Sequence, residues 1–252
     1  MSMSSRIGAA VATAAVLAAA PVAASAAGAQ PASGHPSRPV HHARPGHGHG
    51  PHHAHGKPTD RLHGLRNGVA HAIAAQLKAA KTIAAAAASL DIPDAAALQD
   101  ALTADVAAVS ADRDAVSSAG SRDALHKLLK AAIATRQVAM LQFEIVSGAD
   151  TVAADASTLG ITVAQLQGQL ADLDATTAAA GIALLADADQ QLETVSAGVP
   201  DVVGGVLALA PNASGAQVRA ARGTIGAALA SLRDALAQAE QDVANVQADY
   251  GL

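Results

Sequence analysis

The sequence contains no cysteine and no tryptophan, and it has only one phenylalanine and one tyrosine among its 252 residues. Without cysteine the chain can form neither a disulfide framework nor a lipidated cysteine, so packing alone must stabilise its fold. Phe143 and Tyr250 provide no aromatic platform on which bases or sugars could stack. The composition therefore argues against carbohydrate binding and against single-stranded nucleic-acid binding.

The first 26 residues have the pattern of a cleavable export signal. Arg6 gives a small positive region, and residues 7–20 form an uncharged apolar run. This run of about 14 residues is too short to span a bilayer. Ala24-Ser25-Ala26 then provides a small-x-small cleavage site. We predict cleavage near Ala26 and a mature protein that is secreted or extracytoplasmic, in the periplasm, the cell wall or the medium, with no membrane span.

Acidic residues outnumber basic ones, and the two signs are unevenly distributed. Once Arg6 has left with the signal peptide, 15 Lys and Arg residues face 21 Asp and Glu residues, a net charge of −6. Nonspecific nucleic-acid binding needs a basic face, so no nucleic acid is expected as a partner. No Lys or Arg lies between Arg136 and Arg219, whereas nine acids do.

The segment 61–90 shows the reverse, with four basic residues and no acid. The preferred interpretation places this basic helix beside the acidic fourth helix, where the opposite charges would help select the pairing of the bundle. The alternative is that the acidic region 137–218 forms an exposed face that recruits cations or a basic partner.

Residues 27–60 are rich in Pro, Gly, Ser and His and are predicted to be a disordered arm. Eight of the eleven histidines lie between positions 35 and 55, and the densest group is His47, His49, His52, His53 and His55. Neutral imidazole is the commonest protein ligand for Zn, Cu and Ni ions. These five residues are the candidate metal ligands, although the tract 35–55 lacks the Cys and carboxylate groups of a closed zinc site. The alternatives are a plain spacer, or a pH-dependent cation that binds cell-wall polyanions.

From residue 61 onward, apolar residues recur at helical spacing. A first helix is predicted over 61–90, ending before Pro93, and a second ends at Gly120. Ser121 is the expected N-cap of a third helix reaching residue 159. Gly160 fits a C-cap, and Thr162 with Gln165 resembles a capping box that would open a fourth helix closing near Gly198.

A connector is expected over 199–213, and Ser214 with Gln217 forms a second capping-box pattern at the start of a fifth helix. That helix carries a heptad seam, which requires a partner helix along its length. The seam consists of Ile225, Leu229, Leu232, Leu236, Ala239, Val243, Val246 and Tyr250.

Two further patterns bear on the architecture. Residues 90–102 resemble residues 159–170, which raises the possibility of a duplicated helical hairpin. Residues 138–146 are apolar nearly all round, which favours a buried central helix over a strand or an oligomer contact. Together the signals predict an all-α fold, an elongated antiparallel bundle of about five long Ala-rich helices over 61–252.

No catalytic or nucleotide-binding motif is present in the helical region. His63, His71 and His126 are predicted to be solvated helix residues. The pairs Asp172/Asp174 and Asp187/Asp189 lack the other residues of a calcium loop. We therefore expect a secreted, non-enzymatic helical-bundle protein of structural or interaction type with no certain cofactor. The alternative is an extracytoplasmic protein that binds divalent metals through the His-rich arm.

Overall fold

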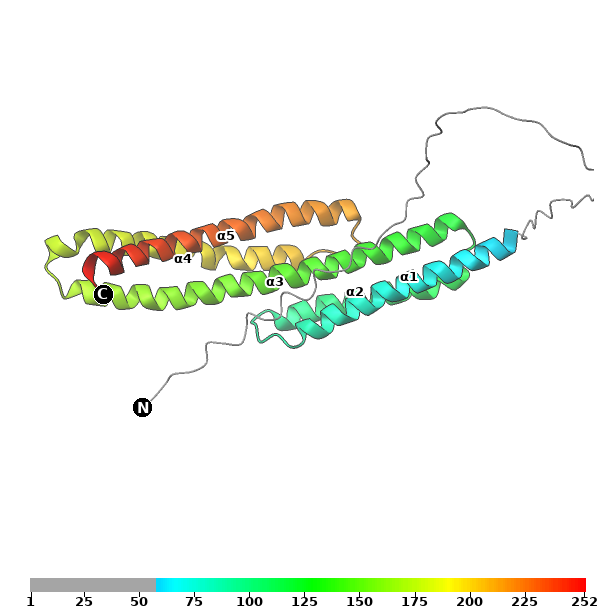
Figure 1. Cartoon of the computed structure of the whole chain (residues 1–252), viewed down its shortest axis with the longest axis horizontal. Helices are drawn as coiled ribbons and strands as arrows, with labels where there is room; N and C mark the ends of the chain where they lie inside the picture. The colour runs from blue at the N-terminus through cyan, green and yellow to red at the C-terminus, as the bar shows by residue number, and fades with distance from the viewer. Residues whose placement is uncertain (1–57) are drawn as a thin grey trace, which may run out of the picture. The chain divides into compact units, whose positions relative to one another are not determined.

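The computed structural model describes residues 58–252, which form five packed α-helices and one turn of 3-10 helix, without any strand (Figure 1). The helices are α1 (Pro58–Ala87), α2 (Ala95–Ala115), η1 (Val116–Ser118), α3 (Arg122–Ala171), α4 (Ala175–Leu207) and α5 (Gly215–Tyr250). The predicted all-α fold with five packed helices is confirmed. The predicted signal peptide and almost all of the predicted arm, including its candidate ligands, lie outside the described residues.

The long helix α3 organises the arrangement. Its 50 residues correspond to about 75 Å at 1.5 Å per residue. The helices α1 and α2 pack against its first half, and α4 and α5 pack against its second half (Figure 1). Among the described helices, none is long and apolar enough to cross a membrane.

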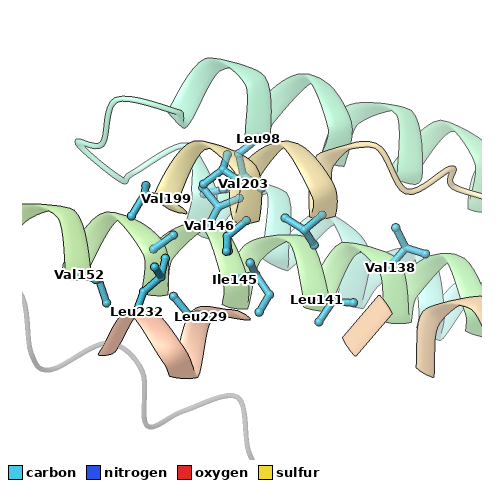
Figure 2. Close-up of a cluster of buried hydrophobic side chains, with 14 of the residues drawn as sticks. Leu98, Val138, Leu141, Ile145, Val146, Val152, Val199, Val203, Leu229 and Leu232 are labelled. Carbon is cyan, nitrogen blue, oxygen red and sulfur yellow. The ribbon is translucent and has the colours of Figure 1, made fainter. Parts of the chain in front are cut away.

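Apolar side chains form three clusters along α3. One joins α1 and α2 to the start of α3, as in Ile73 and Leu125. Another joins α4 and α5 to its end, as in Leu170 and Val243. The central cluster draws on all five helices, and Figure 2 shows Leu98 of α2, with side chains of α3, α4 and α5, in it. The middle of α3 is thus the part of the body where every helix contributes to one core.

This arrangement explains the segment 138–146, which is apolar nearly all round. Six of its nine residues are buried, namely Val138, Ala139, Leu141, Gln142, Ile145 and Val146. Because helices pack on both sides of α3 at this level, most of the segment is buried, and Glu144 is its one exposed residue. The prediction of a buried central helix is confirmed, and the strand alternative is wrong.

The fifth helix also agrees with the sequence pattern. Six of its eight seam residues are buried, and the other two, Ile225 and Tyr250, are partly buried against the core. Ser214 and Gln217 form the predicted capping box, with each side chain accepting a hydrogen bond from the other residue's backbone N–H. Ser121 caps α3 in the predicted way, since its hydroxyl accepts from the Ala124 N–H.

The predicted boundary at residues 159–162 is wrong, because α3 continues through it to Ala171. Thr162 does not cap a helix, and its hydroxyl donates to the Thr158 carbonyl one turn back. The chain turns instead at Asp174, whose side chain accepts from the Thr177 N–H at 3.0 Å and caps α4. Residues 90–102 therefore span a turn while 159–170 lie within α3, so the suggested duplicated hairpin is not present.

The predicted end of the fourth helix near Gly198 is also wrong. The helix α4 runs through Pro200 to Leu207 and carries a continuous buried face that includes Val195, Val199 and Val206. Pro200 is exposed, so the carbonyl that loses its helical donor can be solvated. Packing of the valine face outweighs the cost of an interior proline here.

The preferred account of the charge pattern fails as well. The helix α1 packs against α2 and α3, whereas α4 packs against α3 and α5. The basic and acidic helices are thus separate neighbours of α3 rather than partners. Opposite charge on α1 and α4 did not select the pairing of this bundle.

Candidate functional site

The three histidines of the helical body lie at its surface. His63, His71 and His126 are all exposed on helix surfaces, as predicted. Within residues 58–252, no group of three or more His, Asp or Glu side chains lies close enough to hold a metal ion. The candidate ligands His47, His49, His52, His53 and His55 lie outside the described residues.

An open groove of about 640 Å³ runs between α3 and α4. Its α3 wall consists of small residues, Ala153, Ala156, Ser157 and Gly160. Its α4 wall consists of Asp189, Leu192, Glu193, Val195, Ser196, Val199 and Pro200. Because the side chains of the α3 wall are short, an extended or helical segment in the groove could approach the α3 backbone closely.

Hydrogen-bond acceptors line the α4 side of this groove. Glu193 is exposed, and Asp189 is half-buried and accepts from Gln167 Nε2 at 2.6 Å. Pro200 has no N–H, so the Ser196 carbonyl lacks the donor that residue 200 would supply in an uninterrupted helix. Two carboxylates and a carbonyl without its helical donor therefore belong to residues of one helix that line the groove, and such a set favours a cationic donor.

Within residues 58–252, most of the negative charge around the groove has no ion-pair partner. Of the nine acids between positions 144 and 201, only Glu144 forms an ion pair within the described part of the chain, with Arg222 at 3.3 Å. Asp155, Asp187 and Asp201 are exposed on the same two helices as the groove. Unpaired charges of one sign on neighbouring helices create a negative potential that extends into solvent.

A second groove, of about 470 Å³, has the opposite charge. It lies between α1 and α2 and is lined by Lys78, Lys81 and Arg113 over Ala74, Leu77, Thr82 and Ala85. Arg113 is paired with its neighbour Asp114 at 3.0 Å. Neither lysine has an ion-pair partner within residues 58–252, so both ammonium groups are available to an external acid.

Among residues 58–252, three carboxylates are buried, namely Asp105, Asp150 and Asp242, and burial raises the pKa of the first two. Asp105 of α2 is completely buried, and neither carboxylate oxygen has a hydrogen-bond partner. Burial raises its pKa to about 7. Burial and the nearby Asp94 raise the pKa of Asp150 on α3 to about 6. Because Asp105 is shielded from solvent, it bears on the stability of the fold and not on ligand binding.

Sequence reasoning missed Asp105, although a signal for it was present. The buried face of α2 follows the steps Leu98, Leu102, Asp105, Val109 and Val116, with Asp112 at the remaining heptad position. Val106, the next residue, is only partly buried. The spacing, read without regard to residue type, identifies Asp105 as a core position.

The two acidic pairs that resemble the start of a calcium loop have other roles. Asp174 is the N-cap of α4, and its hydrogen bonds to the Thr177 side chain and backbone lower its pKa. Asp189 lines the α3–α4 groove.

No protein-family model, no curated protein and no solved structure matches the chain. The grooves and their charges are therefore the basis of the functional proposal.

Proposed function

We propose that this chain is an exported, non-enzymatic protein of structural or interaction type. In this proposal its helical body is an elongated antiparallel bundle that presents a charged surface to a partner in the cell envelope or the medium. One observation carries the proposal: the acids that line and flank the α3–α4 groove have no cationic partner among residues 58–252. A groove with carboxylates on its α4 wall and small residues on its α3 wall supports binding of a basic partner.

The electrostatic argument concerns recognition more than affinity. Complementary charge speeds encounter and rejects partners of the wrong sign, while the small residues on the α3 wall permit close contact. A basic protein segment satisfies both requirements. Its cationic side chains would meet Asp189 and Glu193, and its backbone would approach Ala153 and Gly160.

Export is the second part of the proposal, and it rests on the sequence. The charged start at Arg6, the short apolar run over 7–20 and the Ala24-Ser25-Ala26 site support cleavage near Ala26. Mass spectrometry of material from the medium or envelope should find Ala27 as the first residue. Exported protein that still begins at Met1 would contradict this part of the account.

A capture experiment tests the interaction proposal. The mature chain 27–252 and the body 61–252 are immobilised separately and exposed to envelope and medium fractions of the producing cells. We expect both forms to retain the same basic partner and to release it in salt, because the groove belongs to the body. If neither form retains a partner, the interaction proposal is wrong.

A second candidate function is extracytoplasmic metal binding by the arm. The observation that favours it is the density of imidazoles, five between positions 47 and 55. Closely spaced histidines on one segment can share a divalent ion such as Zn, Cu or Ni. This function would reside outside the helical body, so the two candidates can be separated by removing the arm.

A further inference from the structure

The basic and acidic grooves complement each other in a way that the fold itself does not use. Lys78 and Lys81 lie on α1, and Asp189 and Glu193 lie on α4, two helices that do not pack together. Both sets lie at the surface, with only Asp189 half-buried. In the part of each copy that the structure describes, these two lysines and two acids form no ion pair.

The α1 rim of the basic groove is called here the lysine ridge. The α1 residues at its rim all lie on one side of the helix and are exposed, and they are Ala74, Lys78, Lys81, Thr82 and Ala85. Their spacing repeats every three or four residues, so they form a stripe along α1 that is separate from its buried face. Apart from the lysines, the stripe consists of small side chains.

The acidic groove has the matching form. Its α3 wall repeats small residues at the same helical spacing, as in Ala153, Ser157 and Gly160. Two helices with small residues along their contact can approach closely. An α1 stripe laid along this wall would be a further helix beside α3 and α4, in addition to α5.

The charges also match in spacing. Lys78 and Lys81 are three residues apart, a rise of about 4.5 Å, and Asp189 and Glu193 are four apart, a rise of about 6 Å. Lysine side chains are long and flexible enough to bridge the difference. The Ser196 carbonyl, freed by Pro200, is a further acceptor for an ammonium group in the same groove.

We propose that the α3–α4 groove binds the α1 lysine ridge of a second copy of this chain. This inference rests on the proposed interaction function and names a partner for the same groove. Because ridge and groove are different surfaces, the contact can be made twice in a two-fold dimer or repeated head to tail in a chain or a ring. A contact of about three helical turns belongs to the small, transient class of interfaces, so association should be weak and sensitive to salt.

Sedimentation of the full chain tests the proposal through charge reversal. The runs use a range of protein concentrations at about 50 mM and about 500 mM NaCl. They are made at pH 7.5 with EDTA, so that metals cannot link the arms. The variants are Lys78→Glu with Lys81→Glu, and Asp189→Lys with Glu193→Lys. The matched controls are Lys127→Glu with Lys130→Glu, and Asp234→Lys with Glu240→Lys, all at exposed positions outside the two grooves.

At low salt the average molecular mass of the wild type should rise with protein concentration. Each groove variant should associate more weakly, by about tenfold or more. The controls should behave as the wild type. Mixing the two groove variants should restore association, because the reversed ridge then meets the reversed groove. Helical circular dichroism confirms that each variant is folded.

Three results would overturn the proposal. The wild type could stay monomeric at every concentration, the groove variants could associate as the wild type does, or the mixture could fail to restore association. Any of these leaves the capture of an envelope partner by the wild-type groove as a separate question. The failure of self-association is thus distinguishable from failure of the interaction proposal.

Discussion

The Tyr250 hydroxyl accepts a hydrogen bond from the Gly181 N–H at 3.0 Å and donates one to the Thr177 carbonyl at 2.8 Å. An α-helix would join that N–H and that carbonyl directly. The only tyrosine of the chain is therefore set into the hydrogen-bond ladder of α4 and fixes the end of α5 against it. The ring fits because residue 181 has no side chain, since a Cβ there would lie 2.7 Å from Tyr250 Cε2.

Gly181→Ala should therefore lower the free energy of unfolding by about 1–3 kcal/mol, because the added methyl group overpacks the site. Urea denaturation measures the change. Gly168→Ala is the matched control, since its Cβ would meet nothing within 4 Å. Replacing an exposed helical glycine by alanine should raise stability by about 0.5–1 kcal/mol. Changes of the same sign at both positions would contradict the close fit of Tyr250.

Leu232→Asp should lower the free energy of unfolding of the body by about 3–5 kcal/mol, because it buries an unpaired charge on the α5 seam. Leu232 is buried, and its side chain lies against the backbone at Gly198 of α4. Ser231→Asp introduces the same charge at the exposed neighbouring position and is the control. Thermal unfolding followed by circular dichroism compares them. If both variants melt together, α5 is not packed along this seam.

Stability should fall as pH rises from about 4 to about 7. The unfolded chain releases the Asp105 proton near pH 3.8, whereas burial keeps it bound in the folded state up to a pKa of about 7. The protonated carboxyl thus stabilises the fold fully below pH 3.8, and this contribution is lost by pH 7. The difference between the folded and unfolded pKa of Asp105 corresponds to up to about 4 kcal/mol of unfolding free energy.

Asp105→Asn should remove most of this dependence, because the amide does not titrate, and should leave the protein more stable at pH 8 than the wild type. Asp100→Asn, exposed on the same helix, should leave the pH dependence in place. Urea unfolding at pH 5 and at pH 8 compares each of the two variants with the wild type. An Asp105→Asn variant with an unchanged pH dependence would show that Asp105 does not ionise as its burial requires.

The elements that sequence reasoning predicted correctly share one property, namely agreement between local signals and apolar periodicity. At Ser214 the capping box opens the helix that carries the seam, and at Ser121 the cap precedes a continuous stripe. At Gly160 the signals disagreed. The steps Val152, Ala156, Leu159, Val163, Leu166 and Leu170 continue in phase across it, and all but Leu159 are fully buried. Tertiary packing along α3 therefore decided the boundary, and the local capping pattern did not.

The α3–α4 groove was only partly predictable. The charge imbalance of the region 137–218 was visible in the sequence, but the small-residue wall depends on α3 continuing past Gly160 into contact with α4. The free Ser196 carbonyl depends on α4 continuing past Pro200. Both facts follow from packing between residues far apart in sequence. The helix boundaries predicted from the sequence were wrong at these two places, so they did not reveal that packing.

The arm should bind Ni²⁺, Cu²⁺ or Zn²⁺ at neutral pH through His47, His49, His52, His53 and His55. Binding should weaken as pH falls through about 6.5, because protonated imidazole has no lone pair to donate. Calorimetric titration of 27–252 and 61–252 at pH 7.5 and pH 5 measures this. Removal of the arm should abolish binding and leave the melting temperature of the body nearly unchanged. Equal binding by 61–252 would place the ligands in the helices.

The most direct test of the account is whether the acidic groove holds the partner of this protein. Wild type, Asp189→Lys with Glu193→Lys, and the control Asp234→Lys with Glu240→Lys are used as immobilised bait for envelope and medium fractions. We expect the wild type and the control to retain the same basic partner, and the groove variant to lose it by about tenfold or more. Retention of that partner by the groove variant, or its loss only when residues 27–60 are removed, would contradict the account.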